Sequence, residues 1–304
     1  MKELSYLDLT KILSEIEYFV GAKIEQIYMP ERKELILQLH VPGHGKKLLR
    51  INPPNYIYVT EFKPSTDFPP GFCVFLRKKL KNARIQSMDI VPNQRIIRID
   101  LTTKDNVYQL YIELFLKGNV LLCENNKILS PMENQNWEDR TIRGGVDYVI
   151  PERDLIPLST NLNKPLVKFL AVEQNLGGIL AEEICNRVGI DKQKKGITDS
   201  EVSKISNEIE LIYESKASGY IYFKDKKNYS EQDVLVVSPI ELTIYDKLEC
   251  EKLDSLNEAL NKVLTSHLKT EIHIESQKGK IAVKNKYQKI LDAQTNTLKK
   301  IENT

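Results

Sequence analysis

The stretch GFCVFLRKKLKNAR, residues 71–84, combines an apolar and a basic pattern, both at helical spacing. Cys73, Leu76, Leu80 and Ala83 recur every three or four positions, which predicts a helix with one buried face. Another face is basic and contains no acidic residue, although the formal charge of the whole chain is only +2. Such local positive charge suits a phosphate backbone. An ordinary solvated helix face is the alternative interpretation.

Length and composition describe a globular protein large enough for two domains. The chain has 304 residues, of which 41% are hydrophobic, so each of two domains could bury its own core. It contains no apolar run of about 18 residues and no basic-then-apolar leader. We therefore expect a cytoplasmic location and no membrane association.

The cysteines and histidines predict no metal site. The cysteines form no CxxC pair, which argues against both a zinc site and a disulfide framework. His40 and His44 are four residues apart, but prolines and glycines break any helix that could align them as ligands. We expect neither a metal nor a cofactor. Buried reduced thiols are predicted for Cys73, Cys123, Cys185 and Cys250.

Residues 1–160 predict an α+β domain built on antiparallel strands. Ser5 and Asp8 form a variant of the capping box, which starts a helix that ends near Gly21. Short β-like runs follow, separated by Pro- and Gly-rich turns, and they resume after the basic helix. The pattern predicts an antiparallel sandwich or barrel-like domain with two helices. The predicted strands are 23–28, 34–41, 47–51, 56–61, 84–90, 95–102, 107–115 and 118–124.

Residues 161–265 change to a helical pattern. Apolar residues lie at helical intervals on both sides of Gly177 and Gly178, which predicts helix, hairpin, helix. Two glycines permit a tight turn whose backbone amides can approach a phosphate. A plain turn between helices is the alternative. A short β pair is also predicted, at 220–223 and 234–237.

The last residues, 266–304, predict the start of a coiled coil. Apolar residues recur there at spacings of mostly three, four or their sums, with Lys and Glu between them. Such a helix needs a partner to bury its seam, so a dimer through it is one possibility. The apolar positions are Val283, Tyr287, Ile290, Leu298 and Ile301.

Short motifs run through the chain nearly from end to end. They are SYLDL (5–9), RI (84–85), NQRI (93–96), ELF (113–115), GNVLL (118–122), RTIRGG (140–145) followed by Tyr148 and Pro151, LGGILAEEIC (176–185), SPI (238–240) and DSLNEA (254–259). In these motifs and their order the chain resembles the NFACT family, whose members are called RqcH in bacteria and archaea and NEMF in animals.

This resemblance implies a fold and a function. The implied fold is an NFACT-N domain, similar to the N-terminal domain of formamidopyrimidine-DNA glycosylases, followed by a helix-hairpin-helix domain and a coiled coil. The implied partners are tRNA and the large ribosomal subunit, with its rRNA and a stalled peptidyl-tRNA, during ribosome-associated quality control. The implied role is support of C-terminal tailing, with this chain as the tRNA-binding part. Because a coiled-coil hairpin and a further domain follow in the family, we expect a truncated chain, with a natural protein that lacks the second half as the alternative. We also expect weak ribosome affinity, since the ribosomal contacts of the family lie largely beyond residue 304.

The resemblance places tRNA binding on Asp8, Gln94 and Arg95. Asp8 could equally act only as the helix cap. Arg95 falls at the end of a core-facing row of strand residues, and pairing with Asp8 would satisfy both charges and leave guanidinium donors for RNA. The family carries an acidic residue where this chain has Gln94, which cannot form an ion pair but can read a base edge.

The remaining candidates are basic or aromatic residues. Arg140 and Arg143 precede two glycines, in a turn that is either a flexible cationic contact with RNA or a solvated loop. Tyr108, Tyr111 and Phe115 follow a strand pattern and are predicted to lie in the core rather than to stack on bases. The phosphate-contact candidates of the basic helix are Arg77, Lys78, Lys81 and Arg84.

Two alternatives come from other classes of protein. A DNA glycosylase of similar fold would use an N-terminal proline amine, whereas this chain begins MKEL and has no four-cysteine zinc finger. An adhesion scaffold is suggested by bacterial relatives described as fibronectin-binding, but no signal peptide, wall anchor or repeat supports it. The sequence has no GxxxxGK[ST], GxSxG or HExxH motif, so we expect a binding protein rather than an enzyme.

Overall fold

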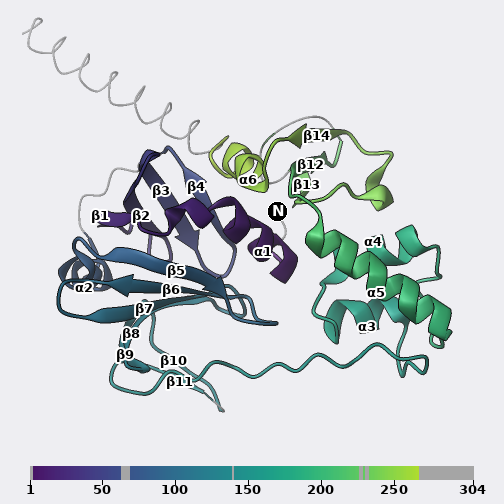
Figure 1. The fold of residues 1–304 in the computed structure, drawn as a ribbon, viewed down its shortest axis with the longest axis horizontal. Helices are drawn as coiled ribbons and strands as arrows, with labels where there is room; N and C mark the ends of the chain where they lie inside the picture. The colour runs from purple at the N-terminus through teal and green to yellow at the C-terminus, as the bar shows by residue number, and fades with distance from the viewer. Residues whose placement is uncertain (1–2, 63–68, 139, 226–228, 230–232, 267–304) are drawn as a thin grey trace, which may run out of the picture.

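The computed structural model describes residues 3–62, 69–138, 140–225, 229 and 233–266. Within these residues the chain is α+β: a nine-stranded antiparallel sheet comes first, a group of helices follows, and a three-stranded sheet comes last (Figure 1).

The large sheet consists of two antiparallel meanders that join at β1 and β5. The strand order is β4-β3-β2-β1-β5-β6-β7-β8-β9. At the junction, the Ile24 amide donates to the Ala83 carbonyl at 2.8 Å. The strands are β1 (Lys23–Tyr28), β2 (Leu35–Val41), β3 (Gly45–Asn52), β4 (Tyr56–Thr60), β5 (Arg84–Ile90), β6 (Ile96–Thr102), β7 (Val107–Glu113), β8 (Asn119–Glu124) and β9 (Lys127–Pro131).

The strands predicted up to residue 124 are confirmed, each within about two residues at either end. They form one continuous sheet with β4 and β9 at its edges rather than a closed barrel. Strand β9 and the short ribbon of β10 (Gln135–Asn136) and β11 (Thr141–Ile142) were not predicted, because their residues lack clear apolar alternation.

Two helices accompany this sheet. In α1 (Tyr6–Glu15) the predicted capping box is confirmed: the Asp8 amide donates to Ser5 Oγ at 3.2 Å, and the Ser5 amide donates to Asp8 Oδ2 at 2.7 Å. The helix is shorter than predicted, since a 3₁₀ turn, η1 (Glu17–Phe19), precedes Gly21. The basic helix α2 (Gly71–Leu80) also ends early, because Asn82 takes a left-handed conformation at φ 63° and β5 begins soon after it.

The helical region contains α3 (Leu166–Val172), α4 (Gly178–Val188) and α5 (Asp199–Glu214). A second capping box, between Thr198 and Glu201, starts α5, and Gly189 ends α4 in the left-handed region at φ 68°. The predicted β pair is confirmed as β12 (Gly219–Phe223) and β13 (Val234–Ser238). The sequence did not predict η2 (Thr243–Tyr245), β14 (Cys250–Leu253) or α6 (Leu256–Leu264).

The small sheet contacts two hydrophobic cores. Ile221 and Phe223 of β12 belong to the core of the large sheet, whereas Tyr222, on the opposite face, belongs to the core of α3–α5. Helix α6 also packs into the first core, against α1 and β4. The boundary at residue 160 stays a prediction, and core contacts cross it.

Polar side chains of α1 hold the later elements in place. Lys11, buried at 5% exposure, donates from Nζ to the carbonyl of Tyr213 at 2.6 Å and to that of Ser215 at the end of α5. The Glu15 carboxylate accepts from the amides of Leu256 and Asn257, at 2.7 and 2.8 Å. It thereby serves the first turn of α6, where unpaired amides favour a negative charge.

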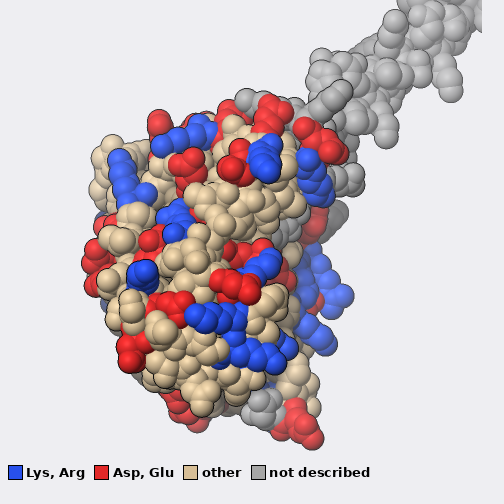
Figure 2. All heavy atoms as spheres, turned by 90° about the vertical axis from the view of Figure 1, so that its right-hand side faces the viewer, with Lys and Arg blue, Asp and Glu red and all other residues tan. Residues whose placement is uncertain are grey.

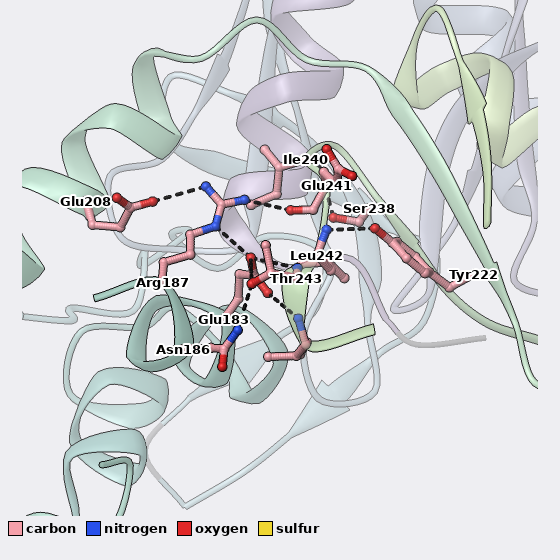
Figure 3. A network of polar contacts seen from close by, with 11 residues as sticks. Glu183, Asn186, Arg187, Glu208, Tyr222, Ser238, Ile240, Glu241, Leu242 and Thr243 are labelled. Carbon is pink, nitrogen blue, oxygen red and sulfur yellow. Dashed lines mark hydrogen bonds and ion pairs between the residues drawn. The ribbon is translucent and has the colours of Figure 1, made fainter. Parts of the chain in front are cut away.

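A buried carboxylate joins α4 to the loop after β13 (Figure 3). Glu183 has 0% exposure and accepts from Arg187 Nε at 2.6 Å and from the amides of Thr243 and Ile244 at 2.9 and 3.1 Å. Arg187 then donates to Glu208 of α5 at 3.0 Å. Because the partners lie in α4, α5 and η2, this network fixes these three elements together.

Some expectations fall outside the described residues or change within them. The predicted coiled coil beyond Ser266 lies outside them, as does Lys2. Cys250 is exposed at the start of β14, so the prediction of a buried thiol is wrong there, while the other three cysteines are buried. The described part of the chain contains no cluster of metal-binding side chains and no helix long and apolar enough to cross a membrane.

The packing of α6 on β12 gives a first prediction. A Cβ added to Gly219 would lie 2.2 Å from the Ser255 carbonyl oxygen and 2.7 Å from Ala259 Cβ. Gly219→Ala should therefore lower the free energy of unfolding by about 1–3 kcal/mol, measured by chemical denaturation. The control Gly71→Ala meets nothing within 4 Å and should be nearly neutral. Equal effects of the two changes would contradict this packing.

The Glu183 network gives a second prediction. Glu183→Ala leaves buried amides and Arg187 without their carboxylate, and should cost about 3 kcal/mol in denaturation experiments. Its neighbour Glu182 forms an exposed ion pair with Lys192, at 3.1 Å, so Glu182→Ala should cost less than about 1 kcal/mol. A comparable loss from both changes would show that the network does not stabilise the fold.

Candidate nucleic-acid interface

Arg95 lies immediately before β6 and reaches the N-terminal segment. Its Nη1 donates to Glu3 Oε2 at 2.9 Å and to the Leu4 carbonyl at 3.1 Å, and its side chain is 25% exposed. The hypothesis that Arg95 pairs with Asp8 is therefore wrong. Asp8 is buried, and its Oδ2 accepts from both the amide and the hydroxyl of Ser5 at 2.7 Å. Asp8 thus serves the cap of α1, whereas the carboxylate that pairs with Arg95 is that of Glu3.

Gln94 is a structural tether. It is 8% exposed, and its Nε2 donates to the Pro151 carbonyl at 2.6 Å. A carboxylate at this position could not donate to that carbonyl. The amide thus holds the segment after Tyr148 against the β5–β6 turn. The sequence suggested that Gln94 reads a base edge, but its side chain is buried in this contact.

The predicted hairpin lies beside this turn. Asn175, between α3 and α4, donates from Nδ2 to the carbonyl of Asn93 at 2.9 Å. Gly177, two residues later, is the N-cap of α4 at φ 76° and offers no side-chain cap to the helix. A Cβ added at Gly177 or Gly178 would meet nothing within 4 Å, so there is free space beside these two Cα atoms.

A narrow crevice joins the start of α1 to the start of α4. Ser5 and Asp8 line one side, Ile179 and Leu180 another, and the loop after β13 a third. Its volume, about 10 Å³, is only enough for a water molecule. The N-terminal segment, the β5–β6 turn and the α3–α4 turn are thus neighbours, although they are far apart in sequence.

The arginines of the basic helix region make structural contacts. Arg77 is half-buried and donates from Nε to the Ile27 carbonyl at 2.7 Å, with its guanidinium 5.9 Å from the Tyr28 ring centroid. Arg84 donates from Nη1 to the Gly21 carbonyl at 3.1 Å. Both residues therefore hold α2 and β5 to β1 and its preceding turn. Lys78 and Lys81 are exposed.

Arg140 corrects another prediction. Its Nη2 binds Glu113, a carboxylate of 2% exposure that also accepts from the Tyr148 hydroxyl at 2.8 Å. Burial raises the pKa of Tyr148, so its hydroxyl stays a donor. Arg140 is thus a fixed partner of the ELF motif and not a flexible cationic contact, because the low-exposure carboxylate demands a cation. Arg143 is exposed.

The aromatic residues of β7 lie in the core, as predicted. Tyr108 and Tyr111 are 2% and 5% exposed, and the Tyr111 ring centroid lies 4.2 Å from that of Tyr148. Phe115 is half-buried under the guanidinium of Arg140. These rings are covered by the protein and do not form a base-stacking platform.

The face with α4 and α5 carries mixed charge. Figure 2 shows basic and acidic side chains interspersed over it rather than a field of one sign. Contacts with nucleic acid there would rest on a few placed donors. Sequence reasoning did not identify the contacts that bring the N-terminal segment, the β5–β6 turn and the α3–α4 turn together. These contacts are made by Glu3, Asn93 and Asn175. The only signal was Asn at two turn positions, where φ is 57° and 54°.

Known proteins resemble this chain over different shares of its length. The archaeal Rqc2 homolog aRqcH of Methanocaldococcus jannaschii is 28% identical over 327 residues, which cover 98% of this chain and 47% of that protein. The NEMF homolog of Drosophila melanogaster, a ribosome quality control complex subunit, is 31% identical over 166 residues, covering 54% of this chain and 17% of that protein. The chain thus spans about half the length of the archaeal relative.

Solved structures share the fold. The fibrinogen binding protein from Staphylococcus aureus superposes with a TM-score of 0.64 at 18% identity, covering 84% of this chain and 97% of that one. The N-terminal part of the fibronectin/fibrinogen-binding protein from Streptococcus suis also gives 0.64 at 18% identity, covering 88% and 100%. Residues 5–304 match the family described as NFACT N-terminal and middle domains, so the chain belongs to the NFACT family.

Proposed function

We propose that this chain is the tRNA-binding part of a factor in ribosome-associated quality control. Relatives named for that process match it, one of them along nearly its whole length. The structural support is the place where the N-terminal segment, the β5–β6 turn and the α3–α4 turn meet, since it unites Arg95 with the Gly177 hairpin.

The donors at this place suit an RNA backbone. Arg95 uses Nη1 on Glu3 and Leu4, which leaves its other guanidinium N–H groups for phosphate. The first amides of α4 have no side-chain cap, and Gly177 and Gly178 let a phosphate come close to them. Asp8 and Gln94 act as positioning residues, because they order α1 and the β5–β6 turn respectively.

The proposed partners follow from this role. The factor would hold tRNA on a large ribosomal subunit that carries a stalled peptidyl-tRNA, in the cytoplasm. C-terminal tailing would use the peptidyl-transferase centre of the ribosome, so the chain would act by binding and positioning and not as an enzyme. Two of the proteins with a similar fold are named for binding of fibrinogen or fibronectin, and likeness at 18% identity extends only to the fold.

A glycosylase activity receives no support from the described residues. Glu3 is the carboxylate that a glycosylase of similar fold would use beside its N-terminal amine, and here it is held by Arg95 at 2.9 Å. That ion pair gives Glu3 a structural role in the N-terminal segment, and this role does not depend on any catalytic activity.

Arg95→Ala tests the proposal. The ion pair between Arg95 and Glu3 is partly exposed, so its loss should change stability by less than about 1 kcal/mol. Crosslinking of RNA to the chain in cells, followed by sequencing, should show tRNA bound to the natural chain and strongly depleted from the variant. The control Arg32→Ala removes an 88% exposed arginine that pairs with Glu133 and should keep the tRNA signal. Equal tRNA recovery from both variants would contradict the proposal.

Gln94→Glu tests the role of the buried amide. The family pattern has an acidic residue at this position, but here a carboxylate would face the Pro151 carbonyl at hydrogen-bond distance. We expect a lower melting temperature and weaker tRNA binding, both measured on the purified chain. A variant as stable as the natural chain, with stronger binding, would show that Gln94 is not a tether.

A further inference from the structure

A basic hollow lies at the C-terminal end of α2. Its volume is about 510 Å³, and it is lined by residues from α2, from the turn after it and from the β6–β7 turn. We define the basic hollow by Lys78, Lys79, Lys81 and Lys104. Lys104 was not among the residues predicted from the sequence, because only the fold brings its turn next to α2.

The charge of the basic hollow is not balanced by the protein. Asp105 is the only acidic residue in its described lining, and within the described part of the chain none of the four lysines forms an ion pair with a carboxylate. Lys79 alone has a ring partner, with Nζ 5.8 Å from the Tyr108 centroid. Like charges held together raise the local potential and favour an anion with several charges.

Neutral polar groups lie among the lysines. Asn106 donates from Nδ2 to the Tyr108 hydroxyl at 2.9 Å, which orients its amide in the lining. Asn82, held at φ 63°, lines the same hollow. Side-chain amides can exchange hydrogen bonds with ribose hydroxyls, and lysines bind phosphates as point charges. This combination favours an RNA backbone over an acidic peptide, which has no hydroxyls at regular intervals.

The basic hollow is separate from the place around Arg95. Arg95 precedes β6, whereas Lys104 follows its other end. Nine residue steps of roughly 3.3 Å separate Arg95 from Lys104, so the two ends of this stretch lie up to about 30 Å apart. In Figure 1, α2 is on the far side of the molecule from α3 and α4. One phosphate group cannot contact both places.

We propose that the basic hollow is a second binding site for an RNA phosphodiester backbone. The inference rests on the proposed function, in which both tRNA and ribosomal RNA present this chemistry. Arg95 and the hairpin would hold one part of the RNA, and the basic hollow would bind a backbone segment beyond the other end of β6 by charge and ribose contacts. This second contact would add affinity without base specificity.

The test is a triple variant that replaces three lysines of the basic hollow by neutral glutamine in the 304-residue chain: Lys78→Gln, Lys81→Gln and Lys104→Gln. The matched control, Lys46→Gln, Lys127→Gln and Lys204→Gln, removes the same charge from exposed lysines elsewhere. Binding of fluorescein-labelled bulk tRNA, and co-sedimentation with purified large ribosomal subunits, are measured over a range of salt concentrations. Circular dichroism melting checks that both variants remain folded.

The hollow variant should bind RNA about tenfold or more weakly than the control in roughly 0.1 M salt, with a salt slope smaller by about 2, because three phosphate contacts at ~0.7 each are lost. Loss for tRNA alone or for subunits alone supports the site and identifies the source of the RNA. Equal binding by the hollow variant and the control overturns the inference, even if Arg95→Ala reduces binding. If the natural chain binds neither probe, both the proposed function and this site are rejected.

Discussion

Helix α1 contacts both hydrophobic cores, and the arrangement of the remaining elements depends on it. Leu7 packs into the core of α3–α5, whereas Leu9 and Ile12 pack into the core of the large sheet. Two charged residues of the same helix, one buried and one half-buried, form directional hydrogen bonds with neighbouring helices: Lys11 binds the end of α5, and Glu15 binds the start of α6. Apolar contacts supply most of the stabilisation, while these charged hydrogen bonds fix the orientation.

This constraint assembles the candidate interface. With α1 fixed between the sheet and the helices, the α3–α4 turn lies against the β5–β6 turn, where Asn175 binds the Asn93 carbonyl. The segment from Arg140 to Pro151 is held to the same region by Glu113 and Gln94. Several NFACT motifs therefore contact one another, because ELF, RTIRGG, Tyr148 and NQRI meet around two buried polar groups. A surface built from such tethered turns can present Arg95 and the open hairpin in a stable geometry.

The sequence predicted the elements well where local pattern decides them. Alternation of apolar residues identified β1 to β8, and the spacing of Ser5 and Asp8 identified the cap of α1. It failed where a distant residue decides the outcome. Arg140 lies in a glycine-rich stretch whose sequence indicates a solvated loop, but its side chain pairs with the buried carboxylate of Glu113. Arg95 pairs with Glu3, whereas Asp8 serves the cap of α1. The basic hollow could not be predicted, because it forms only where the fold places the β6–β7 turn beside α2, and no local sequence pattern indicates that contact.

The two RNA contacts differ in the way they would work. The place around Arg95 has few donors, so binding there would depend on their geometry. The basic hollow depends on unpaired charge and would weaken in salt. A molecule that touches both would be oriented along β6, from the hairpin to the far end of the sheet.

The central claim is that tRNA is held where the β5–β6 turn meets the α3–α4 turn. It is tested most directly by ultraviolet crosslinking of bulk tRNA to the chain, followed by mass spectrometry of the crosslinked peptides. The structure predicts crosslinks at residues 93–95 and 175–179 in the same complexes. Crosslinks that avoid both turns and occur only on other surfaces would contradict the claim.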